Sequence, residues 1–581
     1  MKKAKFVPAD MVNWYKPRML FSIAMKAVIS GTFGNYADRR ETQAALDTDI
    51  KNDDHWKDLE EYYGGTETWI DIVSDTGDGF DSTFAVATCV AKQELEVENP
   101  ETNGKITIPR AKILIFGGDE VYPFPTSEAY ERKFKIPYES ALGKDDDTID
   151  EENRPHLYAI PGNHDWYDGL GNFIKIFCQQ RKIGIWKTKQ HRSYFALPLP
   201  NNCWIWALDI QLNSDIDAPQ LKYFRSISDK MKAGDSVILI TAEPAWVYKA
   251  IYKDNKSCER LSFFIDKFIY DKDGITNKKF KLPVVLTGDL HHYSRYSSKS
   301  TQYITAGGGG AFLHLTHNLP EKIELKENYK LKKLQSFPDS KVSKKLLLGN
   351  LLFPFKNIFF TFLIGSVYLF FYWFFYAEEQ HVFYKNNDSS FSIYNAISKN
   401  CQLLVDNPGA LLITVFLGMG FYAFTETKGF TPNIARFNGF VHSVLQIFVF
   451  FMVIYSANFP IDIDSLKFLI VIPDKVLELI KIIIICFLGA GVSSLVMGIY
   501  LYITNLFFDM HLDEASSSLA CRHYKNFLRI KVHSTGLTIY PIGIKNVPKN
   551  WKMQHHKNDT YSFSGNKVET HLIEKPIEIK F

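Results

Sequence analysis

The chain has 581 residues, of which 46% are hydrophobic and 15% aromatic, and its formal net charge is only +3. A chain of this length is expected to hold more than one domain, and so small a charge argues against nucleic acid as a partner. The seven cysteines are scattered, without the paired spacing of a zinc knuckle or a disulfide framework, which is typical of reduced thiols in a reducing compartment.

Residues 1–65 predict a helical lead-in. Lys2, Lys3 and Lys5 begin the chain, but Lys26 interrupts the first apolar stretch, which argues against a secretory signal peptide. Further apolar residues at helical spacing predict one apolar helical face. That face suits packing on the next domain or lying along a membrane surface, and the sequence leaves both open.

Within residues 66–320, four short apolar runs each end in a loop with a glycine and a carboxylate or histidine. They are Trp69–Asp78, Ile113–Tyr122, Ile160–Tyr167 with the apolar residues before it, and Val284–Tyr293. Each predicts a buried strand that stops in a loop. The carboxyl ends of parallel strands meet at one edge of a sheet, where ligand sites form. We therefore expect the polar side chains of the four loops to converge.

The most specific of these loops is Gly162-Asn163-His164-Asp165. An asparagine oxygen and an aspartate carboxylate suit hard cations, and histidine can ligate a metal or move a proton. Alone, such a tetrapeptide can equally cap a turn. The three similar units elsewhere in the chain favour a shared metal site.

The order of these motifs resembles the calcineurin-like metallophosphoesterases. An Asp follows the first strand, Gly-Asp the second, then come Gly-Asn-His-Asp and a closing Gly-x-x-His, over about residues 66–317. The resemblance implies an αββα sandwich, hydrolysis of phosphoesters, and two divalent metals with a bridging carboxylate. The metal ligands it implies are Asp75, Asp119, Asn163, Asp289 and His291, with Asp119 as the bridge.

The resemblance also implies that His164 is the general acid or steadies the leaving oxygen, with Asp165 orienting its imidazole. His292 and Arg295 follow the last motif and are candidates for substrate binding. A surface position suits Arg295 equally well. The glycines at 307–310 permit phosphate cradling, but the absence of a following Lys or Ser/Thr favours a tight turn against the core.

The sequence departs from the family pattern at several positions. Gly77 stands where the family has a metal-binding histidine, and Asp78 is close enough in sequence to substitute for it. Tyr122 replaces an aspartate that is commonly structural. Ala242 replaces another metal-binding histidine, which weakens the second metal site. Asp289 replaces a third, and a carboxylate there shifts the preference from Zn²⁺ towards Mn²⁺ or Mg²⁺.

Residues 321–350 predict a polybasic linker. It carries Lys322, Lys326, Lys330, Lys332, Lys333, Lys341, Lys344 and Lys345. A solvated linker is one interpretation. Its position before an apolar segment favours a stretch that faces anionic lipid on the cytoplasmic side.

Residues 351–510 predict an α-helical transmembrane domain. Its apolar stretches are Asn357–Ala377, Pro408–Thr425, Phe437–Ala457 and Ile482–Phe508. Basic residues flank them on one side, which predicts that the phosphoesterase domain and both termini are cytoplasmic. Residues 511–581 predict a small C-terminal cytoplasmic α+β unit, rich in strands, that packs under the phosphoesterase domain.

Two hypotheses about function follow. The first is a multi-pass, membrane-anchored phosphoesterase that hydrolyses a phosphomonoester or phosphodiester, possibly lipid-linked, with two divalent ions from among Mn, Mg, Fe and Zn, Mn or Mg being favoured. The second is a catalytically impaired pseudo-phosphoesterase that serves as a membrane scaffold or ligand sensor. Catalysis depends on a complete set of metal ligands, and Gly77 and Ala242 remove two of them.

Overall fold

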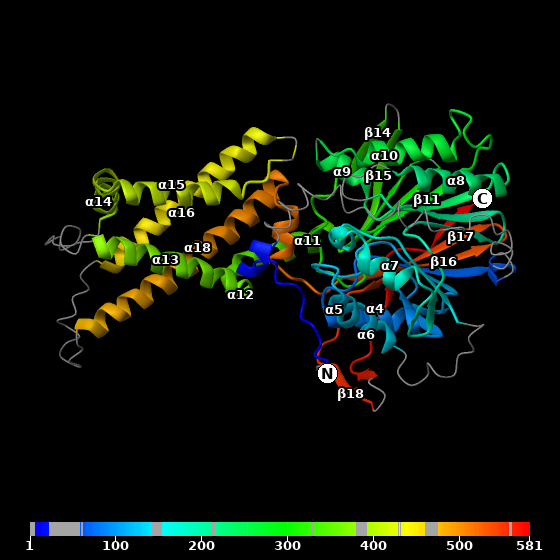
Figure 1. Cartoon of the computed structure of the whole chain (residues 1–581), viewed down its shortest axis with the longest axis horizontal. Helices are drawn as coiled ribbons and strands as arrows, with labels where there is room; N and C mark the ends of the chain where they lie inside the picture. The colour runs from blue at the N-terminus through cyan, green and yellow to red at the C-terminus, as the bar shows by residue number, and fades with distance from the viewer. Residues whose placement is uncertain are drawn as a thin grey trace. The chain divides into compact units, whose positions relative to one another are not determined.

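The computed structural model divides into two compact units (Figure 1). It describes residues 6–22, 59, 62–141, 154–210, 216–252, 254–298, 300–326, 329–378, 392–427, 429, 431–458, 474–556 and 560–581. The first unit comprises Met1–Val12, Met25–Ser343 and Ala520–Phe581, and the second Asn13–Ala24 and Lys344–Leu519. Of the expected N-terminal apolar helical face, Ala24, Met25 and Val28 lie outside the described residues.

The first unit is built on an eleven-stranded and an eight-stranded sheet. The larger sheet has the order β3-β2-β20-β17-β16-β1-β4-β5-β7-β6, with β21 paired to β17, and the smaller one β14-β15-β12-β13-β11-β10-β9-β8. The strands of the larger sheet are β1 (Thr68–Val73), β2 (Glu94–Asn99), β3 (Gly104–Pro109), β4 (Ile113–Phe116), β5 (His156–Ala159), β6 (Lys182–Ile183), β7 (Trp186–Thr188), β16 (Lys525–His533), β17 (Gly536–Ile544), β20 (His571–Leu572) and β21 (Ile577–Lys580). Those of the smaller sheet are β8 (Phe195–Leu199), β9 (Cys203–Ala207), β10 (Ser236–Ile240), β11 (Lys281–Thr287), β12 (Tyr293–Ser297), β13 (Gln302–Ala306), β14 (Lys322–Lys326) and β15 (Tyr329–Phe337), and β18 (Lys552–His555) pairs with β19 (Tyr561–Ser564) apart from both.

Side chains alternate between the two faces of each strand, so a strand buried on both sides is apolar throughout. On β4, Ile113 and Ile115 lie in the core between the sheets, and Leu114 and Phe116 lie in the core outside the larger sheet. Helices cover both outer faces: α4 (Phe80–Ala91) and α7 (Gly171–Phe177) contribute to one outer core, α8 (Ala218–Lys230) and α10 (Ser257–Phe264) to the other. This layering confirms the predicted αββα sandwich.

Parallel pairing places the functional loops at shared edges. β1 pairs with β4 and β4 with β5 in parallel, so the loops that follow these three strands emerge together. In the smaller sheet β10 and β11 are also parallel. The remaining helices of this unit are α5 (Ser127–Ala129), α6 (Ile136–Glu139) and α9 (Ala245–Ile251), with π-helical turns at Tyr130–Lys135 and Ile265–Ile269.

The prediction of a linker over residues 321–350 is wrong for its first half. β14 and β15 form an antiparallel hairpin at the edge of the smaller sheet, and α11 (Ser340–Leu347) follows. The apolar side chains of Ile323, Leu325 and Leu331 are buried while the lysines between them face out. This alternation of buried and exposed residues is typical of strands. The linker prediction rested on the number of lysines and did not consider the alternation.

The C-terminal residues are not a separate unit packed under the sandwich. β16 pairs antiparallel with β1, and β17 pairs with β16, so the end of the chain supplies central strands of the larger sheet. The larger sheet is therefore completed by residues that follow the second unit in sequence.

The second unit is helical. Its helices are α12 (Phe353–Lys356), α13 (Ile358–Glu378), α14 (Ile393–Asp406), α15 (Pro408–Ala423), α16 (Pro432–Asn458), α18 (Asp474–Phe508) and α19 (Leu512–Ser517). Helix α18 packs against α13 and α16, and α15 packs against α16. Two segments, Pro432–Tyr455 and Ile482–Phe508, are long and apolar enough to cross a membrane. Two bent helix pairs, Ser340–Lys356 with Ile358–Tyr372 and Ile393–Asp406 with Pro408–Ala423, raise the number to four if each pair is one span.

Candidate metal centre

Three aspartates just past the ends of β1, β4 and β11 share an unusual backbone conformation. Asp75, Asp119 and Asp289 have φ angles of 57°, 54° and 67°. Residues other than glycine avoid this left-handed region, and such strain clusters at functional sites where the surrounding structure holds it. Asp75 and Asp119 are also buried. The three positions that the sequence singled out are therefore unusual in backbone as well as in charge.

The hydroxyl of Tyr122 marks the point where three loops meet. Its oxygen lies 3.1 Å from Oδ1 of Asp75, 3.1 Å from Oδ2 of Asp119 and 2.9 Å from Nε2 of His291. Nδ1 of His291 lies 2.8 Å from the carbonyl oxygen of Phe312, which only accepts, so Nδ1 carries the proton and Nε2 presents its lone pair to the cluster.

The hydroxyl of Tyr122 has more hydrogen-bond acceptors around it than it has protons to donate. A phenol donates one hydrogen bond, yet three acceptor atoms surround the hydroxyl of Tyr122. Two of the three acceptors must obtain a proton or a cation from elsewhere. The donor set of two carboxylates, one imidazole and one phenol oxygen therefore fits a hard or borderline divalent cation.

Asn163 and Asp289 extend the cluster. The backbone N–H of His164 donates to Oδ1 of Asp119 at 2.8 Å, which places the adjacent Asn163 beside the same carboxylate. Oδ1 of Asn163 is buried and has no hydrogen-bond partner. The backbone N–H of Asp289 donates to Oδ2 of Asp75 at 2.8 Å. The loops that carry the five predicted ligands thus meet in one region, and Oδ1 of Asn163 is without a hydrogen bond. The carboxylate of Asp289 itself accepts from the hydroxyl of Tyr248.

The electrostatics of the cluster also favour a cation. Burial raises the pKa of Asp75, and the nearby charges of Asp119 and Asp289 raise it further. Burial likewise raises the pKa of Asp119, with a contribution from Asp165, and that of Asp289. Carboxylates that are buried and repel one another lower their free energy when a cation neutralises them.

The loop at Gly77 cannot hold the histidine of the family pattern. Gly77 has a φ of 57°, and a Cβ built on it would lie 2.0 Å from the carbonyl oxygen of Glu120. The close contact belongs to a paired loop, because the N–H of Tyr122 donates to the carbonyl of Gly77 at 3.1 Å. Gly77 therefore lets the loop that carries Tyr122 approach the cluster, and the phenol lies beside the carboxylate that the missing histidine would have joined.

Replacing Gly77 with alanine is expected to lower the free energy of unfolding of the first unit by at least about 2 kcal/mol, from the left-handed backbone and the overlap with Glu120 together. Gly274 provides a matched control, because its φ is 69° and the nearest atom to an added Cβ lies 4.0 Å away. Denaturant unfolding of both variants measures the difference. Equal losses would show that the close approach at Gly77 has no cost of its own.

The position of Tyr122 in the cluster was not predicted from the sequence, where the tyrosine replaces a commonly structural aspartate. Gly77 and Tyr122 are linked departures from the family pattern, because their loops pair. The substitute proposed for the missing histidine, Asp78, is wrong. Asp78 accepts from the backbone N–H groups of Val12 at 2.6 Å and Phe312 at 3.2 Å, so its carboxylate is engaged outside the cluster.

Ala242 lies where the sequence placed it, beside the cluster and without a donor. It is buried, and its Cβ would be 2.8 Å from a Cβ added to Gly118, the residue before Asp119. The side chain therefore faces the backbone of the loop that carries Asp119. A second cation would rely on oxygen donors from Asp119, Asn163 and Asp289.

The expected role of Asp165 requires correction. Its carboxylate accepts from the N–H of Gly162 at 2.9 Å and the hydroxyl of Tyr130 at 2.6 Å. Nδ1 of His164 instead lies 2.9 Å from the carbonyl oxygen of Pro123. Asp165 holds the loop, and the carbonyl of Pro123 orients the imidazole.

Neither candidate substrate-binding residue takes part in the contacts around the hydroxyl of Tyr122. Nε of Arg295 donates to Glu574 at 2.9 Å and Nη1 to Gln302 at 2.9 Å, so its guanidinium is occupied within the sheet. His292 is buried, and burial lowers its pKa to about 3. A neutral buried imidazole and a paired guanidinium do not provide a phosphate clamp.

The glycines at 307–310 pack on the loop of Asp75, with the N–H of Gly309 donating to the carbonyl of Ser74 at 2.8 Å, as the tight-turn interpretation predicted.

An αββα sandwich with carboxylate, amide and imidazole donors on its strand-end loops defines a metallophosphoesterase-type domain. Residues 68–293 match the calcineurin-like phosphoesterase family, and the chain contains a domain of that family.

Solved structures that are similar to parts of the chain include the following two. One is GAP50, described as the anchor in the inner membrane complex of Plasmodium, at 11% identity and a TM-score of 0.30 over 43% of this chain and 74% of that one. The other is PhoD, at 11% identity and a TM-score of 0.24 over 43% of this chain and 58% of that one. No curated protein matches the chain.

Proposed function

We propose that the chain is a membrane-anchored, metal-dependent phosphoesterase. The observation that carries the proposal is the excess of acceptors around the hydroxyl of Tyr122, where Asp75, Asp119 and His291 converge. One cation would take these three donors, with the phenol oxygen of Tyr122 as a fourth. A second would share Asp119 and use Asn163 and Asp289, with Mn²⁺ or Mg²⁺ favoured by the oxygen-rich set.

Divalent ions bound there would supply the Lewis acidity that phosphoester hydrolysis requires. The residues of the chain have separate tasks. Because the carbonyl of Pro123 holds the proton on Nδ1 of His164, the opposite nitrogen, Nε2, is the one that gains and loses a proton. A protonated Nε2 would donate to the leaving oxygen as the P–O bond breaks. Asp165 keeps the His164 loop in place through Gly162 and Tyr130.

The membrane part of the proposal rests on the second unit. Its apolar helices would hold the phosphoesterase domain at a bilayer surface, and the distribution of basic residues favours the cytoplasmic side for this domain and both termini. A substrate at that surface would be a phosphomonoester or phosphodiester, either soluble or linked to a membrane lipid.

Ala242 supports a second candidate function. Because Ala242 has no donor atom, at most three side chains could hold the second cation. At the site of the first cation, the hydroxyl of Tyr122 can take the place of the metal by hydrogen bonding to Asp75, Asp119 and His291. The domain would then be a pseudo-phosphoesterase that acts as a membrane scaffold or ligand sensor.

A metal-reloading assay separates the two functions. The full chain, purified in detergent, is stripped with a chelator, reloaded with Mn²⁺, and assayed for metal content and for hydrolysis of p-nitrophenyl phosphate and bis-p-nitrophenyl phosphate. We expect Mn²⁺-dependent hydrolysis, and a kcat about 10²–10³-fold lower in His164→Asn at unchanged metal content.

The exposed His555 on β18 gives the matched control, because His555→Asn removes an imidazole far from these contacts in sequence and should leave kcat unchanged. Absence of bound metal and of hydrolysis with Mn²⁺, Mg²⁺, Fe²⁺ and Zn²⁺ alike would refute the enzyme and favour the scaffold.

A further inference from the structure

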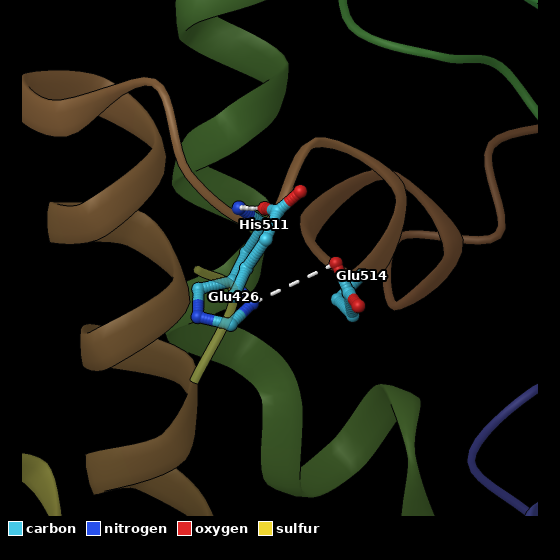
Figure 2. Close-up of side chains that lie close together, drawn as sticks. All are labelled: Glu426, His511 and Glu514. Atoms are coloured by element: carbon cyan, nitrogen blue, oxygen red, sulfur yellow. Dashed lines mark hydrogen bonds and ion pairs between the residues drawn. The ribbon is translucent and has the colours of Figure 1, made fainter. Parts of the chain in front are cut away.

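A second group of metal-ligating side chains lies in the helical unit, outside the phosphoesterase domain. Glu426, His511 and Glu514 each offer one ligand atom, and these atoms all lie within 4.8 Å of one another. Glu426 is in the connection between α15 and α16, His511 precedes α19, and Glu514 is on α19. Figure 2 shows the three side chains together, although Glu426 is 85 residues before His511.

The imidazole of His511 has an open nitrogen directed at this group. The side chain is 0% exposed, and its buried Nδ1 makes no hydrogen bond. Oε2 of Glu514 is 3.6 Å from Nδ1, and the dashed line of Figure 2 joins them. This separation is too long for a hydrogen bond. It is close to the roughly 3.4 Å that separates two ligands each about 2.1 Å from one tetrahedral ion.

The surroundings fix the ring in the orientation that a ligand needs. Nε2 of His511 lies 3.1 Å from the hydroxyl of Tyr500, and the ring of Phe424 stacks on it at 4.9 Å and 7°. When Nε2 donates to Tyr500, Nδ1 presents its lone pair to the carboxylates.

The backbone is held as well. The N–H of His511 donates to Oε2 of Glu426, and His511 has a φ of 55°, in the left-handed region that residues other than glycine rarely adopt. Separate contacts therefore fix the orientation of the His511 ring, the conformation of its backbone and the position of the Glu426 carboxylate beside it.

We propose that Glu426, His511 and Glu514 bind one divalent transition-metal ion, with water completing its coordination. One imidazole and two carboxylates suit Zn²⁺ or Mn²⁺ and offer no soft ligand for copper. The side chain of Glu514 is 40% exposed, which gives the ion a route from solvent. The ion ties the α15–α16 connection to α19, the last helix before the chain enters the first unit again at Ala520. No residue is shared with the phosphoesterase cluster.

Zinc titration of the chelator-stripped full chain in detergent tests this site. To lower the contribution of the phosphoesterase cluster, all variants are prepared in a background that carries Asp119→Asn. We expect one zinc equivalent in this background, and at least about 100-fold weaker binding in Glu514→Gln, because even the loss of a group that only supports a ligand costs 10–100-fold. The melting temperature of the background, but not of Glu514→Gln, should rise with zinc.

Asp513→Asn is the matched control, since it removes the same charge from the neighbouring position of α19 and should bind zinc like the background. His511→Asn should also abolish the zinc equivalent. If His511→Asn does not fold, the partly exposed Glu514 still decides the question. Equal zinc affinity in Glu514→Gln and Asp513→Asn would overturn the proposal. Because both are measured by binding, this result is independent of any phosphatase activity.

Discussion

Replacing Asp119 with asparagine is expected to lower kcat/KM for Mn²⁺-supported hydrolysis of p-nitrophenyl phosphate by at least about 10³-fold, or about 4 kcal/mol. Oδ2 of Asp119 faces the hydroxyl of Tyr122, and Oδ1 accepts from the backbone N–H of His164. One carboxylate therefore borders both halves of the cluster, and both proposed cations depend on its charge. Asparagine keeps the size of the side chain and removes that charge.

The metal-free protein should respond in the opposite direction. Burial and the neighbouring Asp165 raise the pKa of Asp119, which means that the charged form is destabilised when no cation is present. In a chelator, Asp119→Asn should therefore unfold at the same or a higher denaturant concentration than the unchanged protein. With Mn²⁺ present the order should reverse, because a ligand that binds the folded state stabilises it.

Asp229→Asn, on the exposed face of α8, is the control for removing one aspartate charge from the same domain. It should leave both kcat/KM and the Mn²⁺-dependent stabilisation unchanged. An Asp119→Asn variant that keeps its rate and its bound metal would show that the carboxylate is not part of the centre.

The strands and their polar ends were predictable because both leave a pattern within a few residues. The run Ile113–Phe116 is apolar at every position, which is typical of a strand with two buried faces, and Asp119 comes after the two glycines that end it. The order of the four units resembles that of the calcineurin-like metallophosphoesterases, and this resemblance implied the sandwich. The convergence of strand ends at one edge of a sheet predicted that Asp75, Asn163 and His291 lie near Asp119.

The role of Tyr122 was not predictable from spacing. Spacing shows which residues leave a strand end, but the direction of each side chain depends on how two loops pack. The carbonyl of Glu120 approaches Gly77 so closely that only glycine fits, and this approach carries Tyr122 into the cluster. The available signal was the joint occurrence of a glycine at 77 and a tyrosine at 122 in loops of adjacent strands.

The order of the strands in the larger sheet was also not predictable from the sequence. The pattern of β16 and β17 correctly predicts strands, but pairing partners that are several hundred residues apart leave no local mark. β16 pairs with β1 from Thr68↔Val532 to Ile72↔Leu528, across the whole helical unit in sequence. The sequence pattern therefore assigned these strands to a separate unit, whereas the structure places them inside the sandwich.

Replacing Arg529 with methionine is expected to lower the free energy of unfolding of the first unit by about 3–5 kcal/mol, the cost of leaving a buried charge without its partner. Nε and Nη2 of Arg529 each lie 2.7 Å from an oxygen of Asp71, and the two side chains are 0% and 2% exposed. Denaturant unfolding, followed by the fluorescence of the buried tryptophans, measures the loss.

Two variants separate the buried charge from general damage. A double variant, Asp71→Leu with Arg529→Met, removes both charges and should recover most of the stability, because well-packed apolar residues often replace a buried ion pair at little cost. Lys105→Met breaks the exposed pair of Lys105 with Glu96, whose side chains are 56% and 54% exposed, and should change stability far less, because solvent screens exposed ion pairs. A loss for Arg529→Met as small as that for Lys105→Met would contradict the argument.

The location of this ion pair explains why its loss should reach the metal centre. Asp71 lies on β1, the strand that leads to Asp75, and Arg529 lies on β16, opposite Asp71 in the pairing register. Burial raises the pKa of Asp71, and the charge of Arg529 opposes this shift. Arg529 therefore stabilises the carboxylate form of Asp71, which burial alone would disfavour. β1 has β4 on one side and β16 on the other, so the ion pair holds β1 to the strand that follows the helical unit in the chain. Arg529→Met should therefore lower Mn²⁺ binding along with stability, although Arg529 contacts none of the proposed ligands.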